Sequence, residues 1–182
     1  MMMSEEDDFL LDRIASNDAD AFGLLLERHY NRIFRIAFRV LGDKQAAEDV
    51  AQDVCISLSI KITSFDRQSK FTTWLYRIVK NASIDALRKQ NARNRNNEAW
   101  ASVNLMQSEA DQEHTDDLKW LNEIFSQLKD DLKVTVAFVV GEGMSHADAA
   151  KILEVSEGTV SWRMSEVRKI VTLIAKQEGR VS

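Results

Sequence analysis

Residues 65–93 hold the densest set of side chains that could bind a ligand. On a helix expected over residues 71–92, bases and an amide recur at steps of three and four, so they share one face, and aromatic side chains stand at its upstream end. Positive charge follows phosphates, whereas rings and amides engage unpaired bases. The segment therefore predicts an interface for single-stranded or melting DNA, with a solvated basic helix face as the alternative. The expected members are Phe65, Lys70, Trp74, Arg77, Lys80, Asn81 and Arg88, with Ile84 on the same face.

A second candidate interface lies between Ser145 and Arg168. A short helix, a tight turn at residues 154–156 and a longer helix follow one another there, which is the pattern of a helix-turn-helix whose second helix enters the major groove. The alternative is an ordinary helical hairpin, and for Trp162 both DNA contact and packing in the core stay open. The side chains expected to face outward and meet DNA are Thr159, Ser161, Trp162, Arg163, Ser165, Glu166, Arg168 and Lys169.

A third candidate surface is acidic. On a helix expected over residues 44–62, carboxylates surround an isoleucine on the face opposite the apolar stripe. An acidic run is usually a solvated face, but an exposed isoleucine among the acids favours docking on a basic protein partner. A metal site is a weaker interpretation, because helical neighbours alone do not gather around a hard cation. The residues of this face are Glu48, Asp49, Gln52, Asp53 and Ile56.

Patterns typical of catalysis are missing from the sequence. There is no glycine-rich phosphate loop and no nucleophile elbow, the three histidines are scattered, and Cys55 has no paired base nearby in sequence. We therefore expect a protein that is not an enzyme, with no cofactor and no metal site.

Composition points to an all-helical chain. The 182 residues include no proline and only six glycines, which disfavours a turn-rich β fold. A single cysteine indicates a reducing compartment, and the longest apolar run, residues 134–140, is too short to span a bilayer. The acidic first residues lack the layout of a signal peptide, so we expect a cytoplasmic protein with no membrane insertion.

Charge is segregated along the chain. The net charge is −5, yet residues 66–95 hold eight bases and two acids, whereas residues 96–131 hold two bases and nine acids. A local basic block says more about an anionic partner than the net charge does.

The periodicity predicts two small helical domains. Helices are expected over 5–16, 18–41, 44–62 and 71–92 in an N-terminal domain, residues 1–92. A polar, acid-rich stretch over 93–116 predicts a flexible linker. Helices over 118–128, 131–140, 145–153 and 156–176 follow in a C-terminal helix-turn-helix domain, residues 117–182, with Ser145 and Ser156 as N-caps.

Three segments together resemble the sigma-70 family, and specifically its extracytoplasmic-function (ECF) group. They occur in the family's order and cover nearly the whole chain. Cys55 stands where a large aromatic is usual, and Glu154 stands where the turn often has glycine. The matching residues are Ala47-Glu48-Asp49-Val50-Ala51-Gln52-Asp53; Phe65 and Phe71-Thr72-Thr73-Trp74-Leu75-Tyr76-Arg77-Ile78-Val79-Lys80-Asn81 with Asp85 and Arg88; and Gly158-Thr159-Val160-Ser161-Trp162-Arg163 with Arg168.

The resemblance implies a promoter-specificity subunit of bacterial RNA polymerase. The acidic helix would dock on the clamp helices of the largest catalytic subunit. The loop from Phe65 to Lys70 and the helix through Asn81 would capture an extruded base of the minus-ten element, and the helix-turn-helix would read the minus-thirty-five element. Core RNA polymerase, promoter DNA and an anti-sigma factor are the expected partners. A stand-alone helix-turn-helix transcription regulator and a sigma-like interaction protein are the alternatives.

Overall fold

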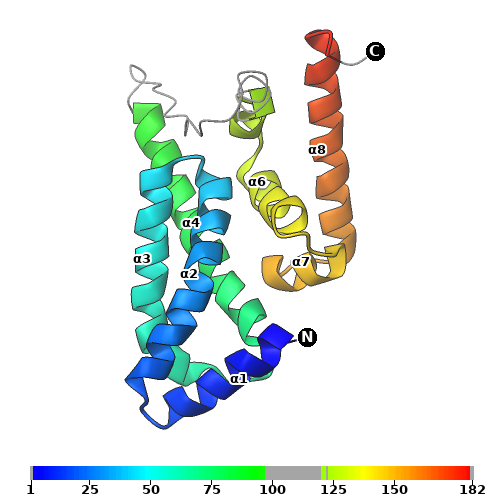
Figure 1. The fold of residues 1–182 in the computed structure, drawn as a ribbon. Helices are drawn as coiled ribbons and strands as arrows, with labels where there is room; N and C mark the ends of the chain where they lie inside the picture. Colours follow the sequence, from blue (N-terminus) through cyan, green and yellow to red (C-terminus); the bar gives the residue numbers. More distant parts are fainter. Residues whose placement is uncertain (1, 97–119, 122, 181–182) are drawn as a thin grey trace.

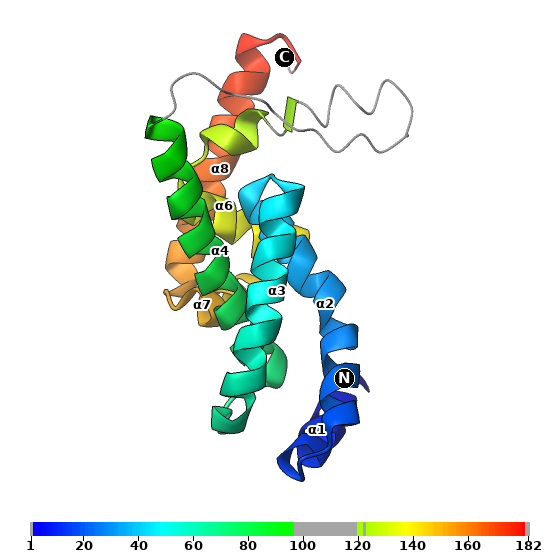
Figure 2. The same cartoon turned by 90° about the vertical axis from the view of Figure 1, so that its left-hand side faces the viewer.

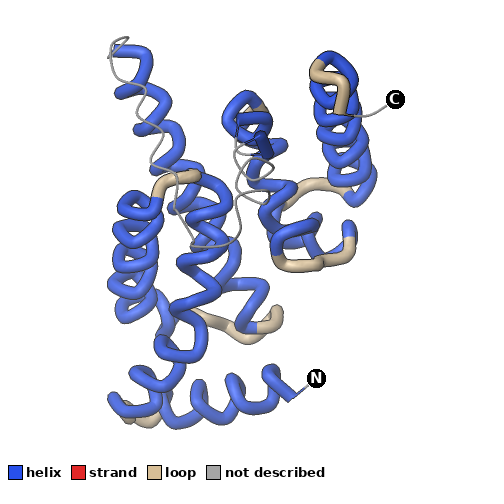
Figure 3. The backbone as a smooth tube through the Cα atoms, turned by 45° about the horizontal axis from the view of Figure 1, so that its top comes forward, coloured by secondary structure: helices blue, strands red, loops and turns tan. Residues whose placement is uncertain are grey.

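The computed structural model describes residues 2–96, 120–121 and 123–180, and every regular element among them is a helix (Figure 1, Figure 3). This confirms the all-α fold class. The elements are α1 (Met2–Ala15), α2 (Ala19–Leu41), α3 (Lys44–Lys61), the 3-10 turn η1 (Ile62–Ser64), α4 (Phe71–Asn96), α6 (Asp130–Val136), the π-helical turn η2 (Ala137–Gly141), α7 (His146–Leu153) and α8 (Glu157–Gln177).

Local sequence signals set the borders of α2 and α3. The Asp18 carboxylate accepts a hydrogen bond from the Ala21 amide and caps α2, and Asp43 caps α3 in the same way through Ala46. Between them Gly42 takes the left-handed conformation, with φ of 68°, which lets the chain leave α2 and turn at once into α3. Both helices therefore begin and end within a residue or two of the sequence prediction.

The helices α2, α3 and α4 lie side by side, and α1 crosses one end of them (Figure 1, Figure 2). Their facing stripes close a core in which Ile33 and Leu75 are completely buried. The helix α4 continues to Asn96, past its predicted end at residue 92. The rest of the predicted linker, residues 97–116, lies outside the described residues.

A buried ion cluster holds α1 against α2. Asp7 is 1% exposed, and its carboxylate oxygens lie 3.0 and 3.1 Å from His29 Nε2 and 3.0 Å from Arg28 Nη1. Burial by itself would raise the pKa of Asp7, but the hydrogen bonds and charges of His29 and Arg28 outweigh it and hold the pKa below its ordinary value of 3.8. His29 itself lies inside the core, with its ring edge-on to Phe71.

In the C-terminal half, Ser145 caps α7 and Ser156 caps α8, as predicted. The helix predicted over 131–140 is divided, because α6 gives way to the wider η2 turn at Ala137. Phe138 is completely buried in that turn, whereas Val140 is 65% exposed at its end.

The two halves share their main core. Phe138 packs against Tyr76 of α4, with ring centroids 6.2 Å apart, and apolar residues of α7 join the cluster built by α2, α3 and α4. A smaller cluster around Leu132 and Val167 lies between α6 and α8. Among the described residues, one large apolar cluster therefore spans both halves of the chain. None of the described helices is long and apolar enough to cross a membrane.

Candidate functional site

Three aromatic rings meet where the chain enters α4. Phe65 leaves η1 in an extended conformation, and its ring centroid lies 5.7 Å from Phe71 and 5.1 Å from Trp74. Phe71 is buried and fixes the cluster to the core, whereas Phe65 and Trp74 are half-buried. The structure therefore brings Phe65 and Trp74, the two predicted base-stacking residues, into contact. Both pack on the buried Phe71 ring, and part of each ring stays exposed to solvent.

The predicted basic face of α4 is only partly open. Asn81 and Arg88 are exposed, and Lys70 is exposed just before the helix. Lys80, in contrast, is 6% exposed, so other residues cover the face that it shares with Asn81 at this position. Sequence periodicity could place Lys80 on the face with Asn81 but could not show what packs against that face.

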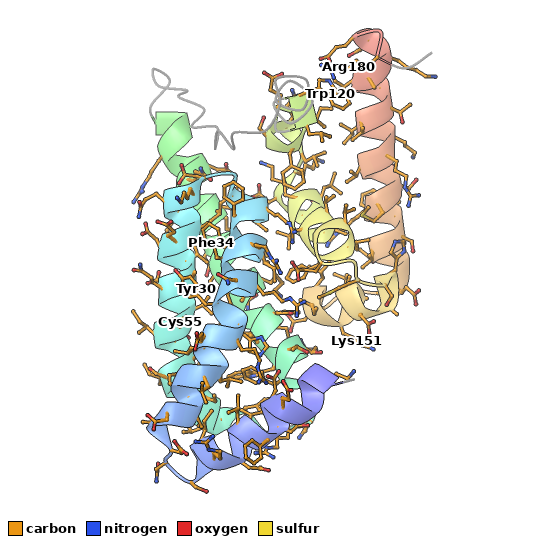
Figure 4. All side chains as sticks on the ribbon, in the orientation of Figure 1. Tyr30, Phe34, Cys55, Trp120, Lys151 and Arg180 are labelled. Atoms are coloured by element: carbon orange, nitrogen blue, oxygen red, sulfur yellow. The ribbon has the colours of Figure 1, made fainter. Side chains whose placement is uncertain are left out.

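The C-terminal half covers this part of α4. Lys80 Nζ lies 2.7 Å from a carboxylate oxygen of Glu154, in the turn between α7 and α8. Arg77 donates two hydrogen bonds, of 3.1 and 2.9 Å, to the backbone carbonyl of Lys151. Lys151 is labelled in Figure 4 on α7, whose neighbour is α4. Two of the predicted phosphate-binding side chains are thus already paired.

The second helix of the helix-turn-helix, α8, has a mixed outer face. Ser161, Trp162, Arg168 and Lys169 are exposed, and Thr159, Ser165 and Glu166 are half-buried. Trp162 is 58% exposed, so it does not pack in the core. Lys169 Nζ lies 2.7 Å from Glu166, which lowers the positive charge that this face offers to phosphates.

Arg163 departs from the prediction. Its side chain is 17% exposed and lies 3.2 Å from the Asp131 carboxylate of α6, so the expectation that it faces outward is wrong. The reason is helical geometry: position 163 adjoins the buried stripe of Val160 and Met164, so its guanidinium reaches across to α6.

The predicted acidic face lies on α3. Asp49, Gln52, Asp53 and Ile56 are exposed, and Glu48 is half-buried. Ile56 is 64% exposed, and Ile60, one turn later, is 73% exposed. The sequence prediction omitted Ile60, although its spacing of four from Ile56 was the available signal.

A groove runs between α3 and α4 beside this face. Its lining combines carboxylates of α3, its N-cap and Asp85 of α4 with bases of α4, a mixture that suits a charged protein surface better than a small ligand. Among the described residues no three potential metal ligands converge. The lining includes Asp43, Asp49, Asp53, Asp85, Lys89 and Arg93.

Known proteins share both the sequence and the order of these features. Residues 25–93 match the family model of sigma-70 region 2. The ECF RNA polymerase sigma factor SigW of Bacillus subtilis is 40% identical over 78 residues, covering 43% of this chain and 42% of that protein. The RNA polymerase sigma-H factor of Pseudomonas aeruginosa is 27% identical over 182 residues, covering 94% of each chain. The chain belongs to the ECF group of the sigma-70 family.

Solved structures in this family share the fold. The sigma factor RpoE of Bartonella quintana, in complex with the anti-sigma factor NepR, superposes with a TM-score of 0.69 at 23% identity, over 85% of this chain and 96% of that one. The region 2 match spans α2, α3 and most of α4. It therefore includes the acidic face, the aromatic cluster and the basic face, all of which sequence reasoning had selected.

Proposed function

We propose that this ECF-family chain is an alternative sigma factor. It binds core RNA polymerase and directs promoter-specific initiation of transcription, including melting of the minus-ten region. The observation that carries the proposal is the co-existence, within one region 2 match, of an exposed acidic and apolar α3 face and an aromatic-amide-basic surface on α4. A plain transcription regulator needs neither of them.

The residues divide by chemistry. Asp49, Asp53 and Ile56 would bind a basic and apolar surface of the polymerase clamp. Phe65 and Trp74 offer ring faces to an extruded base, and the Asn81 amide offers a donor and an acceptor to its edge. The outer side of α8, with Trp162 and Lys169, would enter the major groove of the minus-thirty-five element.

The chain performs no chemistry of its own in this role, and it works in the cytoplasm, where the polymerase is. Its relative in Bartonella quintana is held by an anti-sigma factor. An anti-sigma factor for this chain would have to cover the acidic α3 face or the α4 surface, because these are the surfaces that the polymerase and the promoter need.

Run-off transcription tests the function directly. Purified chain and core RNA polymerase are incubated with a genomic promoter library, and transcripts are mapped to their start sites. A sigma factor yields discrete starts that depend on the added chain and share two upstream elements. Transcripts identical with and without the chain would rule out this function. Tight, sequence-specific duplex binding by the chain alone would instead identify a stand-alone regulator.

A further inference from the structure

The loop that carries Phe65 bends at a strained residue. Among the described residues, Arg67 is one of three residues other than glycine with a positive φ, and its φ of 59° lies in the left-handed region that a residue with a Cβ adopts at a cost. The carboxylate of Asp66 accepts a hydrogen bond of 3.1 Å from the Gln68 amide and closes a tight turn there. Because the chain turns at Arg67, this turn sets the positions of Phe65 before it and of Lys70 after it.

A residue of α1 pairs with this turn. Arg67 Nη1 lies 2.7 Å from a carboxylate oxygen of Asp12, in the last turn of α1. The loop lies at the end of the bundle that α1 crosses, so two segments far apart in the sequence meet there (Figure 2). The pair gives a reason for a charged side chain at a left-handed position, since a glycine would relieve the strain but would offer Asp12 no partner.

The support behind Asp12 is rigid. Leu10 and Leu11, the two residues just before it, are buried in the main core. Asp7, earlier on the same helix, is fixed to α2 by its buried ion pair with His29, at 3.0 Å. A carboxylate on a helix anchored in this way offers a fixed point to a surface loop, unlike one at a frayed terminus.

The same helix reaches the aromatic cluster by a second route. His29, the partner of Asp7, lies edge-on to Phe71, with 5.4 Å between ring centroids. Phe71 in turn supports the rings of Phe65 and Trp74. Helix α1 is therefore connected to the base-stacking rings twice, directly through the loop and indirectly through the buried ring on which they pack.

DNA binding alone does not explain the charge of Asp12. A carboxylate beside a surface that receives phosphates repels them, and this one also neutralises Arg67, a cation of the same loop. Stability of the whole fold does not explain the pair either, because the side chains of Arg67 and Asp12 are 45% and 69% exposed and exposed pairs contribute little. A role in holding the loop in one shape accounts for both observations.

We propose that Asp12 and Arg67 are positioning residues for base capture: through this pair, α1 holds the loop from Phe65 to Lys70 in the shape that receives the extruded base. The inference rests on the proposed function, because it assigns the geometry of the same minus-ten site. A loop that is already ordered binds a base without first losing conformational freedom, so the pair favours capture without touching the DNA. It also narrows the range of bases that fit, because the Phe65 ring then keeps one position relative to Asn81.

Amide hydrogen exchange of the full chain without polymerase measures this hold on the loop. Asp12→Asn removes the charge and keeps the size of the side chain. Residues 65–70 should then open more often and exchange about twofold to fivefold faster, the range expected for the loss of one exposed ion pair. Asp8→Asn is the matched control, since Asp8 is an exposed carboxylate one turn earlier on α1, and its loop should exchange at the wild-type rate.

Base preference separates positioning from a purely structural role. The probes are duplex templates with the promoter that run-off mapping recovers, in versions that carry each of the four bases at each minus-ten position. Permanganate footprinting with core polymerase gives the opening rate on each template. Asp12→Asn should open the preferred template about twofold to fivefold more slowly and should discriminate less between the four bases. A loss of stability alone would slow all the templates by the same factor.

A charge swap tests whether Arg67 acts on Asp12 or on DNA. Arg67→Asn should resemble Asp12→Asn, since asparagine tolerates the left-handed conformation. Asp12→Arg combined with Arg67→Asp forms the pair in reverse, and aspartate tolerates that conformation too, so loop exchange and base preference should return toward wild type. Faster opening by Asp12→Asn, or a swap that opens promoters more slowly than Arg67→Asn, would show that Arg67 binds phosphate and would overturn the inference.

The remaining outcomes each decide one question. Loop exchange at the wild-type rate in Asp12→Asn overturns the inference, and so does faster exchange with an unchanged base preference. In both cases transcription by the wild-type chain leaves the proposed function standing. A wild-type chain that supports no transcription refutes the proposed function, whereas faster loop exchange in Asp12→Asn that the charge swap reverses still supports the hold of α1 on the loop.

Discussion

Replacing Asn81 by alanine isolates base capture from folding. Asn81 is exposed on α4, and its side chain has no hydrogen-bond partner within the part of the chain that the structure describes. Alanine is also the best helix former, so the substitution should leave the free energy of unfolding nearly unchanged. Any loss of function can then be assigned to a contact that forms only with DNA.

The size of the loss follows from the chemistry of an amide. Its donor and acceptor can bind one base edge together, which is worth about 1–3 kcal/mol, so open-complex formation on a duplex promoter should slow by roughly fivefold to 150-fold. Phe65→Ala should slow it too, but part of that loss is structural, since the Phe65 ring packs on Phe71 and Trp74.

Permanganate footprinting with run-off transcription measures the opening. A template that is already melted in the minus-ten region should recover part of the activity of Asn81→Ala, because the unstacking cost of a few kcal/mol is already met. Binding of the variant to core polymerase should equal that of wild type. Opening of duplex promoters at the wild-type rate would show that Asn81 captures no base and that the α4 surface only follows phosphates.

Three further predictions address docking, specificity and stability. The double variant Asp49→Lys with Asp53→Lys should bind core polymerase more weakly while its circular dichroism spectrum stays helical. Unchanged affinity would show that the acidic face of α3 is only a solvated surface. Trp162→Ala should alter the minus-thirty-five bases recovered in promoter selection without lowering the melting temperature, since Trp162 is 58% exposed; a lower melting temperature with unchanged bases would contradict this. Asp7→Asn should lower the free energy of unfolding near neutral pH by about 1–3 kcal/mol. The pKa of Asp7 is lowered in the folded chain. The stabilisation that its carboxylate provides is therefore present above the unfolded value of 3.8 and is lost as the pH falls through the lower folded pKa. Urea titrations should accordingly give the same free energy of unfolding for wild type and variant at that low pH.

Local features of the fold could be predicted because short-range physics determines them. The caps at Ser145 and Ser156 and the periodicity of α2 each depend on residues within one or two turns. The resemblance placed the acidic face and the aromatic cluster for the same reason, since its motifs are contiguous. The order of the helices follows from these signals alone.

Pairings between distant segments could not be predicted. Lys80 and Glu154 are 74 residues apart, and nothing in the periodicity of either helix indicates that they meet. Arg163 is expected on the outer face of its own helix, whereas its partner Asp131 belongs to another helix. The one sequence signal of the contact with Lys80 is Glu154 itself, a charged residue where glycine often stands.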